Sequence, residues 1–322
     1  MKNLEYFNLT TAFLKDCDAL IGMTSLQSLY LNCDKIEDVH ALGSLQGLEK
    51  LVLFSYQSQS LDIGAISNLH KLKELILNIW NYSGDSELTV DLRPLASLTE
   101  LEWLVVASDL VAGQDLDFIA SLTALKTLMI GGMSNVNLDF LSNLEHLEIL
   151  TLNIEDELDL RHLSKAPNLK DLTLSSTNLK DVSAISSLKN LIRLDLFCPS
   201  VRNLRPLSSL KNLEELCLQG ITAEDSSVLG GLSSLKKLDV WGEEDLGFLR
   251  HLNNLQELRI ELVGQNPSFD SQSLSQMLEL EFFRMNYLGK RPEMSVLNTL
   301  PSLKVVWMNG RMITDMSEFT ED

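Results

Sequence analysis

The chain has 322 residues, a formal net charge of −19 and a pI of about 4.6. This acidity argues against nucleic acid and anionic lipid as ligands, because both are bound through basic patches. A protein partner, and in particular a basic one, fits the charge better. No run of apolar residues approaches the roughly 18 that a membrane-spanning helix needs, so the sequence predicts no membrane insertion.

The first residues, from Met1 to Leu9, contain no apolar segment of the kind that a secretory signal requires. The four cysteines are far apart in the sequence and form no CxxC pair or clustered cap: Cys17, Cys33, Cys198 and Cys217. Reduced structural thiols are therefore expected. Both observations predict a cytoplasmic protein.

A Leu-x-x-Leu-x-Leu motif recurs fourteen times along the chain, mostly at a spacing of 22 residues. A fixed period in this range is the signature of a leucine-rich-repeat solenoid, because one repeat cannot bury its own apolar face. We therefore expect a single domain over residues 1–322. Its repeats open at Leu4, Leu26, Leu48, Leu72, Leu101, Leu125, Leu147, Leu169, Leu191, Leu213, Leu235, Leu255, Leu280 and Leu303.

The repeat that opens at Leu169 shows the expected geometry. Apolar residues at Leu172 and Leu174 alternate with polar ones, which is the period of a short strand. The second half spaces its apolar residues by three, which suits short 3₁₀ turns, and Pro94 and Pro206 fit the start of such turns. The prediction is an α/β-type solenoid, a horseshoe with about 14 parallel strands on the concave side and 3₁₀ or extended segments on the convex side.

The runs at residues 36–45 and 204–213 resemble the 22-residue repeats of internalin-type bacterial proteins. The resemblance covers essentially the whole chain. It implies a right-handed, curved solenoid that binds other proteins through its concave face. It also implies an asparagine at motif position nine, whose side chain satisfies backbone groups between adjacent coils. Here no repeat has asparagine at that position, so those backbone groups need other partners.

Motif positions three, five and seven should point outward from the strands and form the concave face. Apolar and aromatic residues at these positions make a candidate partner-binding surface, since soluble monomers seldom leave such a patch uncovered. Ordinary cross-strand packing is the alternative. The candidates are Tyr30, Val52, Phe54, Ile76, Trp103, Val105, Met129 and Ile149 in the first half, and Phe197, Trp241, Arg259, Arg284 and Trp307 in the second.

The loops that follow the strands carry a second group of candidates. Long repeats cluster near residues 48–124, and the largest insertion brings Trp80 and Tyr82 close to the apolar part of the concave face. Acidic residues gather in several of these loops, so an acidic lip beside the concave face is expected. Drift in a tolerant loop, and carboxylates that only keep the protein soluble, are the alternatives. The acidic candidates are Asp109, Asp115, Asp117, Glu155, Asp156, Glu157, Glu243, Glu244 and Asp245.

The sequence contains no Walker loop, dinucleotide fingerprint, zinc-protease motif or nucleophile elbow. Its five histidines lie in different repeats without companions at metal-ligand spacing. We therefore predict no catalytic, cofactor-binding or metal-binding residues, and a monomer. The favoured function is a non-enzymatic, bacterial protein-binding scaffold. An inhibitor or immunity protein that neutralises a basic enzyme or toxin is the first alternative. The second is a recognition module of a larger surface or effector system.

Overall fold

The computed structural model describes residues 3–56, 61–80, 90–108, 116–133, 136–154, 158–242, 246–262, 269–288, 292–315 and 319. The chain divides into two compact units, Met1–Leu169 (unit 1) and Lys170–Asp322 (unit 2). The expectation that residues 1–322 act as one domain stays a prediction.

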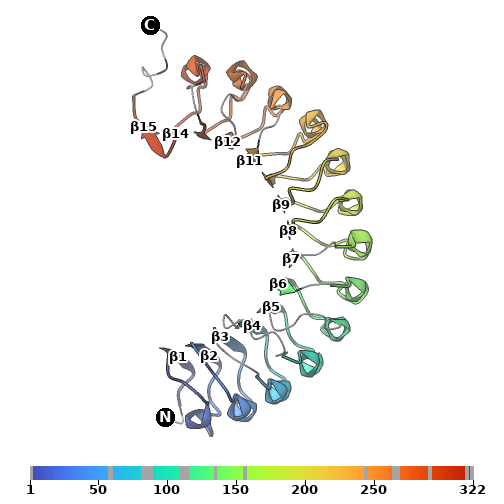
Figure 1. The fold of residues 1–322 in the computed structure, drawn as a ribbon, viewed down its shortest axis with the longest axis vertical. Helices are drawn as coiled ribbons and strands as arrows, with labels where there is room; N and C mark the ends of the chain where they lie inside the picture. Colours follow the sequence, from blue (N-terminus) through green and yellow to red (C-terminus); the bar gives the residue numbers. More distant parts are fainter. Residues whose placement is uncertain are drawn as a thin grey trace. The chain divides into compact units, whose positions relative to one another are not determined.

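Unit 1 is a stack of repeats in which each strand pairs in parallel with the next one in sequence. Figure 1 shows its strands along one side and its 3₁₀ turns along the other. The strands are β1 (Tyr6–Thr11), β2 (Ser28–Cys33), β3 (Lys50–Ser55), β4 (Glu74–Ile79), β5 (Trp103–Ser108), β6 (Thr127–Met133) and β7 (Ile149–Ile154). The turns are η1 (Asp18–Leu20), η2 (His40–Ser44), η3 (Gly64–Asn68), η4 (Arg93–Ser97), η5 (Asp117–Ser121), η6 (Asp139–Asn143) and η7 (Leu160–Lys165).

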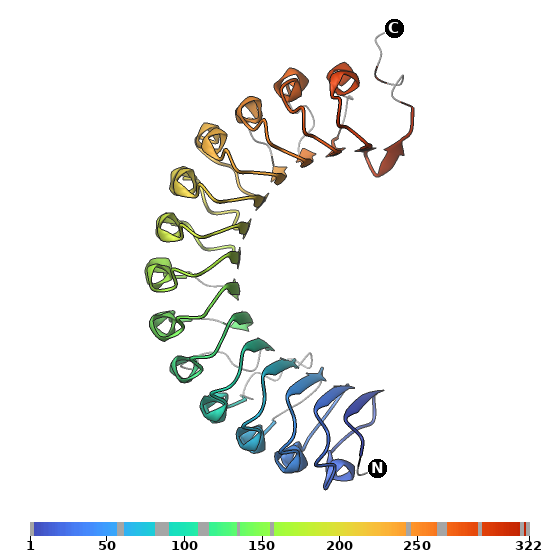
Figure 2. The ribbon, with the colours of Figure 1, turned by 180° about the vertical axis from the view of Figure 1, so that it is seen from behind.

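Unit 2 repeats the same arrangement, as the reverse view in Figure 2 also shows. Its strands are β8 (Asp171–Ser175), β9 (Arg193–Phe197), β10 (Glu215–Gln219), β11 (Lys237–Gly242), β12 (Glu257–Leu262), β13 (Phe282–Asn286), β14 (Val305–Met308) and β15 (Arg311–Ile313). Its turns are η8 (Ser183–Ser187), η9 (Arg205–Ser209), η10 (Ser227–Gly231), η11 (Gly247–His251), η12 (Ser271–Leu274) and η13 (Ser295–Thr299). The predicted solenoid, with strands opposite short 3₁₀ turns, is confirmed.

The last strand is a feature that the leucine motif does not predict. β15 runs antiparallel to β14, whereas the other described strand pairs of unit 2 are parallel. The chain reverses at Asn309 and Gly310, which both have positive φ angles of 47° and 75°. Two consecutive residues of this kind form the tight turn that joins antiparallel strands. The asparagine–glycine pair therefore replaces the usual crossover with a hairpin.

The core of both units consists of the apolar motif positions. Leu128 in unit 1 and Leu172 in unit 2 are fully buried, as are most of the leucines that open each repeat. Positions three, five and seven alternate with these buried positions, in the order that the sequence predicts. Apolar burial on this scale is the main stabilising contribution to the stack.

Small polar side chains at motif position eight provide partners for the backbone in place of the missing asparagine. Ser55 Oγ accepts a hydrogen bond from the backbone N–H of Ile36 in the preceding repeat, at 3.3 Å. Ser176 Oγ accepts from the backbone N–H of Leu179 at 3.2 Å. The thiol of Cys198 donates to the Leu174 carbonyl at 3.5 Å. Buried serine and cysteine therefore satisfy backbone groups within the strands and in the segments that follow them.

Asparagines at the end of the repeat add a further series of bonds between repeats. The side-chain amide of Asn168 donates to the Glu145 carbonyl at 2.8 Å. Asn212 donates to the Lys189 carbonyl at 2.9 Å in the same manner. Asparagine thus bridges neighbouring repeats here from the end of the repeat rather than from position nine.

Candidate binding faces of the two units

The concave face of each unit consists of three rows of side chains that cross the strands. The strand pairing places equal motif positions side by side, for example Val52 beside Ile76 and Asp239 beside Arg259. Position three gives a first row, position five a middle row and position seven a third row. Nearest neighbours within a row are about 4.8 Å apart along the sheet, so a row forms one continuous surface.

In unit 1 the middle row is apolar on five consecutive strands. The strand register sets its members side by side, and the series runs from β2 to β6 as Tyr30, Val52, Ile76, Val105 and Met129. The ring of Tyr30 lies 5.7 Å from the ring of Phe54, with which it packs in a tilted arrangement. The structure therefore brings five of the eight predicted candidates of this half together as a continuous stripe, while Phe54, Trp103 and Ile149 lie in the rows beside it.

The exposure of these residues is uneven. Trp103, in the first row, is 38% exposed, whereas Tyr30, Phe54, Ile76, Val105, Met129 and Ile149 are half-buried. The expectation that Val52 is open to a partner is wrong, because its exposure is only 5%. Val52 lies between Tyr30 and Ile76 on the adjacent strands, and these larger side chains surround it. Trp103 is thus the most accessible apolar anchor of the concave face of unit 1.

Trp80 lies just after β4 and is half-buried. Its ring passes close to Gly132, where an added Cβ would lie 2.8 Å from the Trp80 Cη2 atom and 2.9 Å from the Ser108 carbonyl oxygen. Gly132 also has a φ of +74°, in the left-handed region that favours glycine. Packing against the later repeats therefore accounts for the position of this tryptophan. Tyr82 lies outside the described residues.

The acidic lip remains a prediction for most of its members. Asp109, Asp115, Glu155, Asp156, Glu157, Glu243, Glu244 and Asp245 lie outside the described residues. Asp117 is exposed, but it begins turn η5 and so lies on the convex side rather than beside the strands. For Asp117 the expected place in the lip is therefore wrong.

Acidic residues on the convex side have a local role that the sequence analysis did not assign. Many turns are preceded by a side chain that accepts a hydrogen bond from the backbone N–H two residues later. Asp91 accepts from Arg93 at 3.0 Å, and Asn203 does the same for Arg205 at 3.1 Å. The guanidinium of Arg93 also holds the pKa of Asp91 at about 2. Part of the negative charge thus serves to start the turns.

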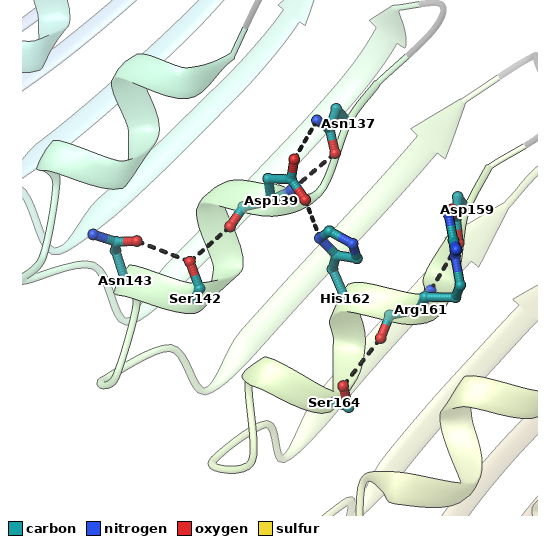
Figure 3. A network of polar contacts seen from close by, with 8 residues as sticks. All are labelled: Asn137, Asp139, Ser142, Asn143, Asp159, Arg161, His162 and Ser164. Atoms are coloured by element: carbon teal, nitrogen blue, oxygen red, sulfur yellow. Dashed lines mark hydrogen bonds and ion pairs between the residues drawn. The ribbon is translucent and has the colours of Figure 1, made fainter.

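Polar contacts on two neighbouring convex turns of unit 1 are shown in Figure 3. Asp139 Oδ2 accepts a hydrogen bond from the Asn137 amide at 2.7 Å, and its other oxygen contacts His162 Nδ1 from the next repeat. Arg161 pairs with Asp159 and lowers the pKa of that carboxyl to about 2. These contacts join turn η6 to turn η7 and give His162 a structural partner.

The first row of unit 2 is a charge ladder. Positive and negative side chains alternate on consecutive strands, in the order Asp171, Arg193, Glu215, Lys237 and Glu257. Arg193 contacts Glu215 at 2.5 Å and Asp171 at 3.4 Å, while Lys237 contacts Glu215 at 3.1 Å. Arg193 and Lys237 thus form their ion pairs with carboxylates of the first row.

The middle row of unit 2 borders a shallow hollow of about 300 Å³ across β9 to β12. Asp195 and Asp239 lie on either side of Cys217, followed by Arg259 on β12. Arg259 pairs with Glu257, lies 3.9 Å from the Asp239 carboxylate and stands 5.4 Å over the Phe282 ring. Among the described residues, Asp195 accepts no hydrogen bond and forms no ion pair.

Burial dominates the electrostatics of this hollow. It raises the pKa of Asp195, and the nearby carboxylates of Asp171, Glu215 and Asp239 raise it further, against the opposing effect of Arg193. Burial likewise raises the pKa of Asp239. The thiol of Cys217 has its pKa raised to about 12, first by burial and then by Asp239 and Asp195. The hollow therefore holds a neutral thiol between two incompletely compensated carboxylates.

The third row of unit 2 has aromatic side chains on β9 and β11. Gln219 on β10 pairs with Trp241 on β11, and Phe197 occupies the same position on β9. Trp241 is 40% exposed, and its indole N–H donates a hydrogen bond to Asp239 Oδ1 at 2.5 Å. Arg284 is exposed beside Arg259, and Trp307 is half-buried beside Arg284. Trp241, Phe197 and Arg259 thus lie beside Asp195 and Asp239, two carboxylates that the sequence did not single out.

The described residues show no feature of a metal site or of a membrane span. They contain no group of three or more His, Cys, Asp or Glu side chains suited to holding a metal ion. They also contain no helix with the length and apolar character needed to cross a bilayer.

The solved structures that this chain resembles are leucine-rich-repeat proteins, and among them are internalins. An internalin of Listeria monocytogenes is 26% identical with a TM-score of 0.68, over 88% of this chain and 80% of that one. A leucine-rich-repeat protein of Leptospira interrogans is 19% identical with a TM-score of 0.61, over 94% of this chain and 83% of that one. No protein-family model and no curated protein matches the sequence. The chain is therefore a leucine-rich-repeat protein that resembles internalins, as its repeats predict.

Proposed function

We propose that this protein is a non-enzymatic scaffold that binds a protein partner through the concave faces of its repeats. The observation that carries the proposal is the continuous apolar middle row of unit 1, with Trp103 exposed beside it. An apolar stripe on an open sheet face is a typical feature of a protein interface. Residue types that dominate binding energy occur on both concave faces, tyrosine and tryptophan in unit 1 and tryptophan and arginine in unit 2.

The similarity to an internalin supports a protein-binding scaffold rather than an enzyme. The arrangement of the titratable side chains supports the same reading. The concave carboxylates of unit 2 are mostly paired with cations, and the described histidines lie on or beside convex turns. A cytoplasmic location and a bacterial origin belong to this proposal, and the four free cysteines support the former.

Affinity capture from a lysate of the source organism, followed by mass spectrometry, tests the proposal. The purified chain is compared with Trp103→Ala and with Lys165→Ala, which changes an exposed residue of turn η7 on the convex side. We expect a partner that is retained by the wild type and by Lys165→Ala and lost with Trp103→Ala. Equal capture by all three proteins would contradict binding through the concave face.

An inhibitor or immunity protein that neutralises a basic enzyme or toxin is a second candidate. The net charge of −19 and the carboxylates in the hollow of unit 2 favour it. Electrostatic steering by such a surface accelerates association at low salt, and salt screens this effect. We expect the association rate with a basic partner to fall at least tenfold between low and high salt. An association rate that is independent of salt would contradict the inhibitor role, and the scaffold role would remain as the proposed function.

A further inference from the structure

Three strands of unit 2, β9 to β11, place two carboxylates and two aromatic rings around a central column of smaller side chains. Asp195 and Asp239 flank Cys217 in the middle row. Phe197 and Trp241 occupy the third row on the same outer strands. The hollow of about 300 Å³ is open to solvent and lies between the first and middle rows of β9 to β12, where the first row contributes Arg193, Glu215, Lys237 and Glu257 to its lining. Asp195, Cys217 and Asp239 line this hollow, which we call the Cys217 hollow, and the two aromatic rings lie in the adjacent third row.

The charges in the Cys217 hollow are not balanced. The nearest cations are directed elsewhere: Arg193 contacts Asp171 and Glu215, and Lys237 contacts Glu215. Arg259 pairs with Glu257 and is 3.9 Å from Asp239. Asp195 therefore has no cation at ion-pair distance within the described part of the chain. A half-buried carboxylate in this position favours a cationic ligand, because the ligand would supply the missing charge.

We propose that the Cys217 hollow receives an arginine side chain of the partner protein. The guanidinium lies over Cys217 and bonds to Asp195 on one edge and Asp239 on the other. Its aliphatic stem packs along Trp241 and Phe197. The inference rests on the proposed function, since it identifies the chemistry by which the concave face of unit 2 holds a protein partner.

The geometry favours arginine over lysine for two reasons. Asp195 and Asp239 lie on strands that are two apart, so their backbones are separated by about 10 Å. A planar guanidinium has five donors on more than one edge and can bridge two carboxylates, whereas an ammonium concentrates its donors on one atom. Trp241 also offers an exposed ring, on which a guanidinium stacks well.

Cys217 is suited to the floor of such a site. Its side chain is short, so it leaves space between the two neighbouring carboxylates. Its thiol stays neutral at physiological pH, and so it adds no charge of its own. A larger side chain at this position would fill the hollow. The chain thus has a small neutral residue at the location where the guanidinium must lie.

The test measures binding of the full chain to the peptide acetyl-Gly-Gly-Arg-Gly-Gly-amide by titration calorimetry. The same peptide with norleucine or lysine in the central position provides the comparison. We expect the arginine peptide to bind at least threefold more tightly than the lysine peptide, and the norleucine peptide to show no binding over the same concentrations. Equal affinity for the arginine and norleucine peptides would overturn the proposal.

Two variants locate the peptide on the structure. Asp195→Asn keeps the shape of the side chain and removes its charge. We expect this variant to bind the arginine peptide at least fivefold more weakly than the wild type. Asp181→Asn is the matched control, because it removes the same charge before turn η8, where its amide oxygen can still accept the bond from Ser183. Unchanged affinity in Asp195→Asn, or an equal loss in Asp181→Asn, would also overturn the proposal.

Failure of this proposal can be distinguished from failure of the proposed function. If the peptides do not bind while Trp103→Ala still abolishes capture of the partner, the arginine site is wrong and the scaffold role stands. If the arginine peptide binds with the expected dependence on Asp195 but no variant affects capture, the site stands and the proposed function is wrong. Circular dichroism of Asp195→Asn and Asp181→Asn checks that each variant is folded.

Discussion

In unit 1 the middle row of the concave face is apolar from Tyr30 to Met129, whereas in unit 2 the same row carries Asp195, Asp239 and Arg259. In each unit the row lies over buried leucines, and the 3₁₀ turns lie on the opposite side of the sheet. The difference lies only in the outward positions of a common repeat. A solenoid can therefore change the chemistry of its binding face along its length without altering the residues that stabilise it.

The largest expected effect tests the shared core. Leu128→Ala in unit 1 and Leu172→Ala in unit 2 each empty a fully buried position, at a cost of about 2–5 kcal/mol in the free energy of unfolding. Denaturant titration of both variants provides the measurement. Similar losses support a common core. A loss below about 1 kcal/mol in either variant would show that its strand register is wrong.

Two glycines at motif position eight, one in each unit, differ in how closely their neighbours pack against them. Gly132 in unit 1 and Gly220 in unit 2 both have positive φ angles, but Gly132 is closely covered by Trp80 and Ser108. Gly220→Ala should therefore cost about 1–2 kcal/mol from the backbone alone. Gly132→Ala should cost about 2–4 kcal/mol, because the steric clash adds to it. Equal melting temperatures for the two variants would contradict the packing of Trp80.

Exposed tryptophans separate binding from stability in the two units. Trp103→Ala and Trp241→Ala should each change the free energy of unfolding by about 1 kcal/mol or less, because these side chains are 38% and 40% exposed. Their effect on partner affinity should be tenfold or more if the concave faces bind as proposed. Chemical denaturation measures the free energy of unfolding of each variant, and binding titrations on the same samples measure its affinity for the partner. A destabilisation as large as that of Leu172→Ala would rule out this assignment of the faces.

The smallest expected effect concerns Asp195. Folding raises the pKa of this carboxyl, so the folded state binds its proton more tightly and the charged form opposes folding. Asp195→Asn should thus raise the melting temperature slightly at pH 7, by at most about 2 °C. The difference from the wild type should shrink as the pH falls through the raised pKa, since both side chains are then neutral. Thermal scans of the two proteins at pH 7 and pH 4 test the sign.

Most of the fold could be predicted from the sequence, because the leucine period fixes which residues are buried and hence where the strands lie. The partners of the backbone could not be predicted in this way. Nothing in the sequence shows that Ser55, Ser176 and Cys198 at position eight form hydrogen bonds with the backbone; these bonds are visible only in the structure. The hairpin at Asn309 is similar, since it follows from a local turn rather than from the repeat.

The candidate site was only partly predictable. Outward positions follow from the period, but exposure depends on the size of neighbouring side chains, and for this reason Val52 is buried between Tyr30 and Ile76. The Cys217 hollow can be recognised only when residues at the same motif position on adjacent strands are considered together. Asp195, Cys217 and Asp239 are 22 residues apart, and the repeat period was the signal that could have grouped them. Which cations are already paired became clear only from side-chain geometry.

Hydroxyl-radical footprinting of the captured complex tests the central claim most directly, because it reports the accessibility of individual side chains. Trp103 and Trp241 lie on the concave faces, while His40 and His251 lie on the convex turns η2 and η11. We expect the partner to protect both tryptophans from oxidation and to leave the oxidation of both histidines unchanged. Protection of the histidines with full oxidation of the tryptophans would contradict this expectation.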